Sequence, residues 1–576
     1  MMFYGDRART IPTAAKLAEV GELMRAAASQ RPGIERHGAL VEALIGAGEL
    51  LQGVADAEFQ ICGEDEETPA QAAASALLRS LAEAVAISWA SDFAADVEPD
   101  FASLEGLKAQ VLSEQITCKV AEGYAYYAVY PEAYLEAASD LAPASGATVI
   151  GIRSIGTGLA AIVAAALGPD AKTSTVRPFG HPFDRKVKLG AALLEGLARR
   201  DGLQVVVDEG PGLSGSSFAA VWEMLHTVGI DASRVVFMPS HGGEPGPRAG
   251  DTQRRSWASV LKAHKDFDAV FVETKRPAHR LEHWIGDLIG PVVAPLQDIS
   301  AGRWRDATHQ APAIARYERR KFLARTAEGT YLLKFAGLAS AGRDKATRAR
   351  LLAEAEFTPP VLGLRHGFLV QSWQTEARPL DLCDCDRGRL IAWLGSYFAF
   401  RAERFQAAPE DGGPLPELLH MMRVNVAKAL GEEIAAVLEA RVAGFAETAR
   451  PPRAIHVDGR LHSWEWLVLP DGRLLKTDAV DHSCQHDLVG CQDLAWDIAG
   501  ARLELELDAR ETEDLLGALT ELGERTDTNL LAVFTACYAA FQLGLWQSDA
   551  AASPEDGRLV AAHAKRYRKA LLDLAA

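Results

Sequence analysis

The amino-acid sequence predicts a multidomain α/β fold with a helical N-terminal region, a parallel-sheet domain and a bilobal α+β domain. Apolar residues spaced three and four positions apart run through residues 13–95, as in helices with one buried face. Short β-rich runs alternate with helical stretches between 147 and 272, which is typical of a parallel sheet covered by helices. Beyond 305, short strand-like segments precede long helical ones, an order that indicates two lobes. We place the domains at 1–105, 106–300 and 305–576.

The composition is that of an ordinary globular protein. The 576 residues include 60 Lys and Arg against 78 Asp and Glu, a net charge of −18, and 48% are hydrophobic. This length suits three or four domains, each with its own core, and the composition argues against a disordered or fibrous chain. The acidic balance disfavours broad nucleic-acid binding, which needs a positive surface. We expect small-molecule metabolites as partners and leave homo-oligomerisation open.

The cysteines and the apolar runs indicate a compartment. Seven cysteines are few and odd in number, so a disulfide framework is not expected and a reducing cytoplasm fits better. The N-terminus has no apolar run of signal-peptide length. The most apolar stretches, 147–167 and 530–546, are both interrupted by polar residues and fall short of the ~20 apolar residues of a membrane span. We therefore expect a cytoplasmic protein without a membrane partner.

The individual elements follow from the same patterns. No catalytic cluster stands out in 13–95, so this region is interpreted as a helical cap or interaction element. In the parallel-sheet domain we expect strands at 148–152, 205–207, 235–238 and 269–272, with helices at 159–167 and 218–227. In the last domain we expect strands at 316–322, 323–326, 330–335 and 367–371, a helix at 344–356 and a hairpin of 466–469 with 474–478.

A buried strand followed by two acids and a Gly/Ser-rich loop forms the first candidate site. Val205–Val207 leads into Asp208 and Glu209, and three glycines and three hydroxyls follow before a helix begins. Glycines allow close backbone approach, and amides at a helix N-terminus favour a phosphate dianion. The ligand should lie outside the carboxyl ends of the parallel strands. Adjacent acids there suit a sugar diol or Mg²⁺, and this interpretation is preferred to a plain connecting loop.

This segment resembles the phosphoribosyl-diphosphate motif of type I phosphoribosyltransferases. The resemblance implies that Asp208 and Glu209 bind the ribose hydroxyls and that the loop holds the 5′-phosphate through Gly212, Leu213, Ser214, Gly215, Ser216 and Ser217. The earlier run 151–158 is similar to the family's diphosphate loop, which implies diphosphate binding by Arg153, Ser154, Gly156, Thr157 and Gly158. Together the two matches cover about 150 residues in the expected order. They imply Mg²⁺-dependent transfer, or hydrolysis, of a phosphoribosyl group, with Asp208 and Glu209 as catalytic residues.

Three segments near this site allow two interpretations each. The basic stretch 175–186 is either a mobile flap over a polyanion or a solvated surface loop. The tyrosines at 124, 126, 127 and 130 suit core packing better than stacking on a base. His241 follows a strand, so its side chain could lie at the edge of the ligand.

A lysine, an acidic helix and two aspartates form the second candidate site. Lys334 stands in an apolar strand, where an ammonium must turn to solvent or find an anionic partner. A predicted helix then offers Glu354 and Glu356. Asp458 and Asp478 flank the predicted hairpin, so both can approach one substrate and one Mg²⁺.

This order resembles aminoglycoside phosphotransferase-like small-molecule kinases. The resemblance implies ATP as phosphoryl donor, with contacts to ATP from Lys334, its ion-pair partner Glu354 (or Glu356) and the hinge residues Gln371 and Trp373. It further implies a catalytic role for Asp458, a Mg²⁺ ligand at Asp478 and a structural aspartate motif at 493–497. Ser463 occupies the family's metal-binding Asn position, so His462 or Glu465 compensates or the site is inactive. No clear Gly-rich loop precedes Lys334.

A His/Cys-rich stretch gives a competing metal interpretation. His482, Cys484, His486 and Cys491 offer four zinc-type donors within ten positions. Their spacing is not that of a usual zinc finger, so polar loop residues are the favoured interpretation over zinc. The pair Cys383 and Cys385 is weaker still.

Two functions remain in view. The first is a bifunctional enzyme that combines phosphoribosyl chemistry with ATP-dependent phosphorylation of a nucleotide- or sugar-like metabolite. The second is a regulatory sensor that binds phosphoribosyl diphosphate or nucleotides through a pseudokinase domain. Because the chain is acidic, polyanionic ligands need local positive charge, which we expect from Arg153, Arg177, Arg185, Lys186 and Lys334.

Overall fold

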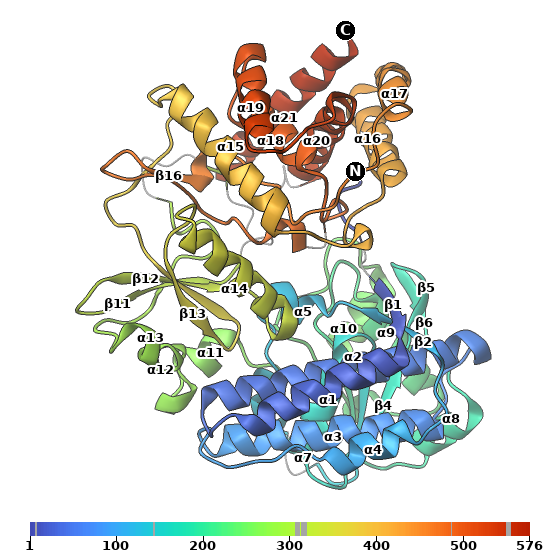
Figure 1. Cartoon of the computed structure of the whole chain (residues 1–576). Coiled ribbons are helices and arrows are strands. Elements are labelled where there is room, and N and C mark those ends of the chain that lie inside the picture. The colour runs from blue at the N-terminus through green and yellow to red at the C-terminus, as the bar shows by residue number, and fades with distance from the viewer. Residues whose placement is uncertain (6–7, 142–143, 306–310, 313–318, 485–486, 549–553) are drawn as a thin grey trace.

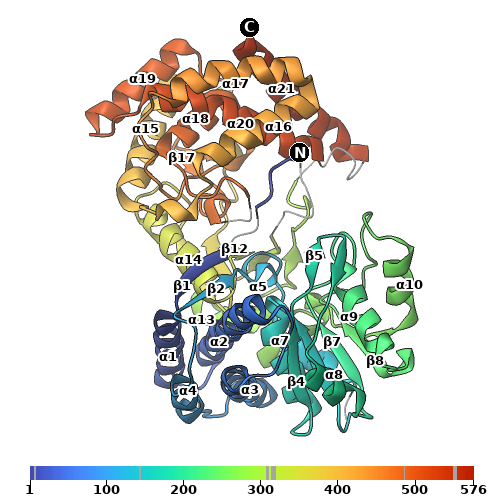
Figure 2. The ribbon, with the colours of Figure 1, turned by 90° about the vertical axis from the view of Figure 1, so that its right-hand side faces the viewer.

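A computed structural model describes the 576-residue chain except for residues 6–7, 142–143, 306–310, 313–318, 485–486 and 549–553. The C-terminal helices α15 to α21 lie at one end of the molecule, and the N-terminal helices lie with the parallel sheet at the other (Figures 1 and 2). The protein is a mixed α/β chain with a five-stranded parallel sheet and a five-stranded antiparallel sheet.

The N-terminal region is helical, as predicted. Its helices are α1 (Thr13–Ser29), α2 (Ile34–Cys62), α3 (Pro69–Ala90) and α4 (Phe101–Lys108). They are preceded by β1 (Ala8–Pro12), which pairs antiparallel with β2 (Gln115–Lys119). Leu40, Leu44 and Val85 are completely buried and share one core with residues of the parallel sheet.

The parallel sheet has the strand order β4-β3-β7-β8-β9. Its strands are β3 (Thr148–Ile152), β4 (Lys172–Val176), β7 (Gln204–Val207), β8 (Val235–Met238) and β9 (Leu261–Lys262). The accompanying helices are α5 (Glu122–Tyr126), α6 (Pro131–Ser139), α7 (Ile155–Leu167), α8 (Ala191–Ala198), α9 (Ser216–Thr227) and α10 (Asp251–Ser259). The strands predicted at 148–152, 205–207 and 235–238 and both predicted helices are confirmed.

The strand predicted at 269–272 is wrong. Residues 269–271 belong to α11 (Phe267–Phe271), which Val272 caps, and the short helices α12 (Leu281–Trp284) and α13 (Gly286–Ile289) follow. Phe267 and Phe271, four positions apart, both pack against Tyr130. A short apolar run fits a buried helix as well as a strand, so its periodicity could not distinguish the two.

The antiparallel sheet has the strand order β10-β11-β12-β14-β13. Its strands are β10 (Gln297–Asp298), β11 (Lys321–Arg325), β12 (Thr330–Phe335), β13 (Val361–Arg365) and β14 (Phe368–Ser372), with α14 (Ala339–Glu354) between β12 and β13. The strands predicted at 330–335 and 367–371 and the helix at 344–356 are confirmed. One strand, β11, replaces the two predicted at 316–322 and 323–326, and residues 313–318 lie outside the described residues.

The C-terminal region is mostly helical and has its own core. Its helices are α15 (Arg387–Arg404), α16 (Leu415–Leu430), α17 (Glu432–Ala446), α18 (Leu494–Glu504), α19 (Ala509–Glu521), α20 (Thr528–Ser548) and α21 (Pro554–Ala575). A small sheet of β15 (Arg378–Pro379), β16 (Trp466–Val468) and β17 (Leu474–Lys476) contains the predicted hairpin.

Two helices are long and apolar enough to span a membrane by length and composition. They are α2 and the stretch Thr528–Gln547 of α20, and 78% and 83% of their apolar windows are buried inside the protein. Burial in the two cores therefore accounts for their apolar character. All seven cysteines lie among the described residues, and all are free thiols.

Candidate functional sites

The first site is a large cavity at the carboxyl edge of the parallel sheet. Its volume is about 1530 Å³. Asp208 and Glu209 follow β7 and line it, and its far wall is formed by residues 265–273 and Arg320. The ligand position expected from the sequence, outside the ends of the strands, therefore coincides with a cavity large enough for a nucleotide-sized molecule.

The two acids are held in place by backbone contacts and are only partly accessible. The Tyr134 hydroxyl donates to the Asp208 carbonyl at 2.8 Å, and the Glu209 carbonyl accepts the Ser240 N–H at 2.7 Å. Burial raises the pKa of Asp208 to about 7 and the pKa of Glu209 to about 8, the latter helped by the Asp208 charge. Near neutral pH the pair thus carries less than its full negative charge, and a bound cation would restore it.

The predicted phosphate loop divides into a lining part and an anchoring part. Gly212, Leu213 and Ser217 line the cavity, whereas the hydroxyls of Ser214 and Ser216 point elsewhere. Both hydroxyls donate to the Pro182 carbonyl, Ser216 at 2.7 Å and Ser214 at 3.4 Å. Gly215 caps α9 with a φ of 67°, a left-handed conformation that favours glycine.

Pro182 belongs to a hairpin formed by the basic stretch predicted as a flap or surface loop. Its strands are β5 (Phe179–His181) and β6 (Asp184–Lys186). Arg185 lines the cavity, and Lys186 is exposed. The two serines therefore attach this hairpin to the start of α9, beside the cavity.

The predicted diphosphate loop is mostly a packing element. The Arg153 guanidinium is buried and pairs with Asp65 and, at 3.2 Å, with Asp56, so its charge is already compensated. A Cβ on Gly156 would lie 2.4 Å from the Val207 carbonyl, and a Cβ on Gly48 would lie 3.4 Å from Gly158 Cα.

In this loop Ile152, Arg153, Ser154 and Ile155 line the cavity, and the buried Thr157 does not. Gly156 and Gly158 allow α7 to approach the sheet and α2, and diphosphate binding by Gly156, Thr157 and Gly158 stays a prediction. Arg177 lines the cavity too, and its guanidinium is held by Asp56 at 2.7 Å.

The tyrosines and His241 take different places. Tyr124, Tyr126 and Tyr130 are buried, as core packing predicts, but Tyr127 is 39% exposed and lines the cavity. His241 also lines it, and burial together with His264 lowers the pKa of His241. An aromatic ring and an imidazole therefore both line this cavity.

The second site centres on Lys334 of β12. Its ammonium contacts the Asp478 carboxylate and lies 2.5 Å from Asp481 Oδ2. Burial opposes the charge, but the two carboxylates outweigh it and hold the pKa of Lys334 above its ordinary value. The anionic partner required by a lysine in an apolar strand is thus supplied by the segment after β17.

The ion pair predicted between Lys334 and Glu354 is not formed. Glu354 is exposed at the last residue of α14, and Glu356 lies 3.6 Å from Arg473. The α14 residue that reaches this region is Lys345, whose ammonium lies 3.0 Å from Asp481 Oδ1. Asp481 therefore takes the place expected for the helix glutamate, and α14 contributes a second cation.

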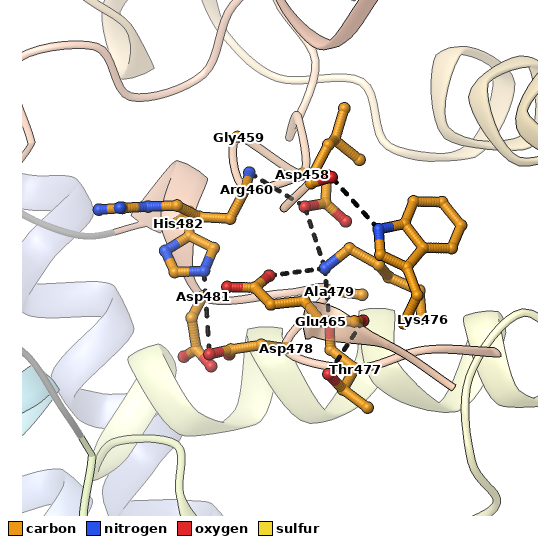
Figure 3. A network of polar contacts seen from close by, with 12 residues as sticks. Asp458, Gly459, Arg460, Glu465, Lys476, Thr477, Asp478, Ala479, Asp481 and His482 are labelled. Carbon is orange, nitrogen blue, oxygen red and sulfur yellow. Dashed lines mark hydrogen bonds and ion pairs between the residues drawn. The ribbon is translucent and has the colours of Figure 1, made fainter. Parts of the chain in front are cut away.

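Asp458 lies in a dense network of polar contacts (Figure 3). Its side chain is completely buried; Oδ2 accepts the Tyr397 hydroxyl at 2.6 Å, and Oδ1 lies 3.5 Å from the Lys476 ammonium. Asp497 accepts the N–H groups of Asp458 and Gly459 at 2.8 and 2.9 Å. The motif at 493–497 therefore fixes the backbone of the loop that carries Asp458.

Three side chains near Asp458 form a group that could hold a metal ion, and the role predicted for Ser463 as a metal ligand stays a prediction. Ligand atoms of Glu465, Asp478 and His482 all lie within 4.8 Å of one another. Figure 3 shows Glu465 and Asp478 directed into the same space, with Lys476 contacting Glu465 at 2.8 Å. His462, the other residue considered as compensation for Ser463, instead faces the Tyr567 hydroxyl at 3.1 Å. Of the two compensating residues considered from the sequence, Glu465 has the suitable position.

Burial raises the pKa of Glu465 to about 7 despite the neighbouring Lys476. Two carboxylates side by side are hard oxygen donors, so Asp478 and Glu465 are the members of this group that could hold Mg²⁺.

The two residues predicted to form the hinge, Gln371 and Trp373, have different surroundings. Trp373 and the residues after it line a second cavity of about 350 Å³ together with the β16–β17 turn. Gln371 does not line this cavity and instead pairs with Leu332 in the sheet. Trp373 therefore has a place suited to stacking on a base, and Gln371 has a structural place.

Of the four residues weighed as zinc ligands, the structure describes His482, Cys484 and Cys491. Cys484 Sγ and Cys491 Sγ lie 3.7 and 3.3 Å from His456 Nδ1, and the Arg348 guanidinium lies 3.0 Å from Cys484 Sγ. His486 lies outside the described residues. Burial opposes ionisation of Cys484, but Arg348 and His456 lower its pKa to about 6. The interpretation favoured from the sequence, polar loop residues and not a zinc site, stays a prediction.

Three residues of the second site were not identified from the sequence. Asp481, Lys476 and Tyr397 contact the predicted residues from segments that sequence spacing does not connect. Lys476 had a detectable signal, because it is a lysine in a short apolar strand like Lys334. Tyr397, in the middle of the amphipathic helix α15, had none.

Comparison with known proteins gives only distant likenesses. No family model matches the chain, and no curated protein sequence matches it. About half of the chain has a structural match to choline kinase LicA from Streptococcus pneumoniae, with a TM-score of 0.34 and 16% identity over 51% of this chain and 98% of that one.

A choline/ethanolamine kinase family protein from Mesorhizobium loti matches with a TM-score of 0.30 and 16% identity over 49% of this chain and 94% of that one. A mutant of aminoglycoside phosphotransferase APH(4)-Ia, solved with AMP-PNP and hygromycin B, also matches. The TM-score is 0.31, and the identity is 16% over 50% of this chain and 98% of that one. These scores are low, and the function is therefore inferred from the two sites alone.

Proposed function

We propose that the C-terminal half is an ATP-dependent small-molecule phosphotransferase. The observation that carries the proposal is the convergence of Lys334, Asp458, Asp478 and Glu465 on one buried polar centre between the antiparallel sheet and the helical lobe. A lysine for phosphates, a carboxylate for the acceptor hydroxyl and two carboxylates for a metal are the parts that phosphoryl transfer needs. The substrate is a small metabolite with a free hydroxyl.

Each residue has a role that follows from its contacts. The carboxylate partners of Lys334 keep its ammonium charged. When phosphates bind, this ammonium would exchange its contact with Asp478 for a contact with them. Asp458 would accept the proton of the attacking hydroxyl, which requires the Tyr397 hydroxyl to release Oδ2. Asp478 and Glu465 would hold Mg²⁺, which neutralises phosphate charge when bound.

The direct test measures ATP consumption and ATP binding in Asp458→Asn. We expect nucleotide binding to persist and transfer to fall about 10²- to 10⁴-fold, because a general base is lost while the phosphate contacts remain. Asp514→Asn is the matched control, because Asp514 is exposed on α19 of the same helical lobe and lines neither cavity. Equal activity in Asp458→Asn and the wild type would refute this assignment.

We propose a second activity, phosphoribosyl transfer or hydrolysis, for the cavity beside the parallel sheet. It is supported by Asp208 and Glu209 at the sheet's carboxyl edge, by Ser217 at the start of α9 and by Arg185 and Arg320 among the lining residues. Acids for a ribose diol and a helix N-terminus for a phosphate would position the sugar, and the cations would stabilise the departing diphosphate. Phosphoribosyl diphosphate is the proposed ligand.

A paired substitution separates the two proposed activities. Asp208→Asn with Glu209→Gln should abolish phosphoribosyl diphosphate turnover and leave ATP consumption, whereas Asp458→Asn should do the reverse. If both ligands bind but neither is consumed with a broad metabolite panel, the regulatory sensor with a pseudokinase domain becomes the better description. The burial of Asp458 is the observation that favours this alternative.

A further inference from the structure

A second cluster of metal-ligand residues lies outside the residues that form the two sites, between the N-terminal helices and the antiparallel sheet. His37 comes from α2, Glu132 from α6 and His366 from the turn between β13 and β14. Their side chains are 0%, 0% and 1% exposed. Three polar side chains from distant parts of the sequence are therefore enclosed together in the core that the N-terminal helices share with the parallel sheet.

The two imidazoles meet a single carboxylate oxygen. His37 Nε2 and His366 Nε2 each lie 2.7 Å from Glu132 Oε1. The other oxygen, Oε2, is buried and has no hydrogen-bond partner among the described residues. Carboxylates usually satisfy both oxygens when buried, and hydrogen bonding alone leaves one of them unsatisfied here.

The charge of the cluster also favours a bound cation. The ion pairs of Glu132 within the described chain are with the two histidines, and no lysine or arginine joins them. A buried carboxylate is costly without a positive partner. A divalent cation would supply that charge and could bind both oxygens.

We propose that His37, Glu132 and His366 bind one zinc-type divalent ion. Two imidazoles with one carboxylate favour zinc and its transition-metal neighbours over Mg²⁺ or Ca²⁺. Bond lengths of about 2.0–2.1 Å place neighbouring tetrahedral ligand atoms about 3.3 Å apart, so the ligand atoms need to separate by only about 0.6 Å. The fourth position would belong to water or to Glu132 Oε2.

The surroundings already orient the ligands. His37 Nδ1 lies 3.0 Å from the Ser88 hydroxyl, which fixes the ring and directs Nε2 to the ion. The backbone of His366 is in a left-handed conformation, with a φ of 41°, and its carbonyl accepts the Tyr130 hydroxyl at 2.7 Å. The ion would join α2 and α6 to the turn beside the sheet that carries Lys334, so its role is structural.

The experiment measures zinc content and zinc ligands in the full-length protein. After chelator treatment and reloading with Zn²⁺ in excess Mg²⁺, we expect one tightly held equivalent by elemental analysis. Glu132→Gln and His366→Gln should each lose this equivalent. His279→Gln should retain it, because His279 lies in the same aromatic core but contacts the Trp89 carbonyl instead. Cys484→Ser should also retain it, which excludes the thiol cluster.

A spectroscopic measurement on the wild type keeps the test independent of variant folding. X-ray absorption at the zinc edge should show nitrogen and oxygen ligands with scattering from two imidazoles and no sulfur. A sulfur shell, an equivalent that survives Glu132→Gln, or no bound zinc would overturn the proposal. The last result would leave the triad as a hydrogen-bonded clamp without an ion.

Discussion

Lys334 and Asp481 set the electrostatics of the candidate kinase site. Both are almost completely buried, and Lys334, Lys345 and Arg319 all face Asp481, at distances of 2.5, 3.0 and 4.0 Å. These cations hold the pKa of Asp481 well below its ordinary value although burial opposes this. Removing one partner from such a network leaves an uncompensated buried charge, which costs more than the pair itself contributes.

Lys334→Met should therefore lower the free energy of unfolding by about 3–5 kcal/mol, measured by urea denaturation. Lys108→Met is the control, because Lys108 forms an exposed ion pair with Glu105 on α4. A surface pair of this kind contributes about 1 kcal/mol or less. Equal losses in the two variants would show that Lys334 is not an electrostatic centre.

The acids of the parallel-sheet site predict a pH dependence. The raised pKa values of Asp208 and Glu209, about 7 and 8, mean that the folded protein holds these protons more tightly than the unfolded chain. Stability is then fully present at low pH and is lost as pH rises through these values, by up to about 1.4 kcal/mol per pH unit and group. Asp208→Asn with Glu209→Gln should flatten this part of the denaturation profile. An unchanged slope would contradict the assigned pKa shifts.

At the scale of elements, strands that end in functional residues were predictable from the sequence. The strands before Asp208 and around Lys334 are short and strongly apolar, so their positions were clear. The failures occurred where tertiary contacts decide. Residues 269–271 are helical, and Tyr130, directly before α6, and Trp284 of α12 pack against Phe271 there. Glu354 does not form its predicted ion pair, because Lys345 is the α14 residue that reaches Asp481.

The same reasoning explains the outcome for the metal ligands. Ser463 was assigned as a metal ligand only from its position in a motif, and that assignment stays a prediction. Glu465 follows it in the turn Ser463–Glu465 and is held by Lys476 of β17, a contact that pairing of β16 with β17 creates. The presence of a site was thus predictable, whereas its full composition was not.

The hairpin β5–β6 gives a prediction at this scale. The Ser216 hydroxyl attaches it to α9 through the Pro182 carbonyl. Ser216→Ala should speed amide hydrogen exchange in the hairpin about 5-fold, the equivalent of a hydrogen bond of about 1 kcal/mol. Ser233→Ala removes a hydroxyl from an exposed turn elsewhere and should leave the hairpin unchanged. Equal exchange in wild type and Ser216→Ala would show that the serine does not hold the hairpin.

At the scale of the whole molecule, one core runs through all three predicted regions. It joins Leu44 of α2, Leu159 of α7 and Phe335 of β12. The C-terminal helices have a separate core. The boundary predicted at residue 105 therefore crosses a continuous apolar interior. Deletion of residues 1–105 tests whether they form a separate domain.

Deleting residues 1–105 should leave a chain that does not fold. The deletion removes α2 and α3, which cover Leu159 and Ile162 of α7, and would expose a large apolar surface. We expect insoluble expression or a loss of cooperative thermal unfolding. A soluble fragment that unfolds cooperatively would instead establish the N-terminal helices as a separate unit.

The central claim is that the Lys334–Asp458–Asp478 centre transfers phosphate. The most direct measurement incubates the full-length protein with ATP labelled in the γ-phosphoryl group, Mg²⁺ and a metabolite extract, with and without phosphoribosyl diphosphate. We predict that label moves from ATP into a small molecule with the wild type and that Asp458→Asn abolishes this transfer. Binding of ATP without transfer of label to any small molecule, in wild type and variant alike, would contradict the claim.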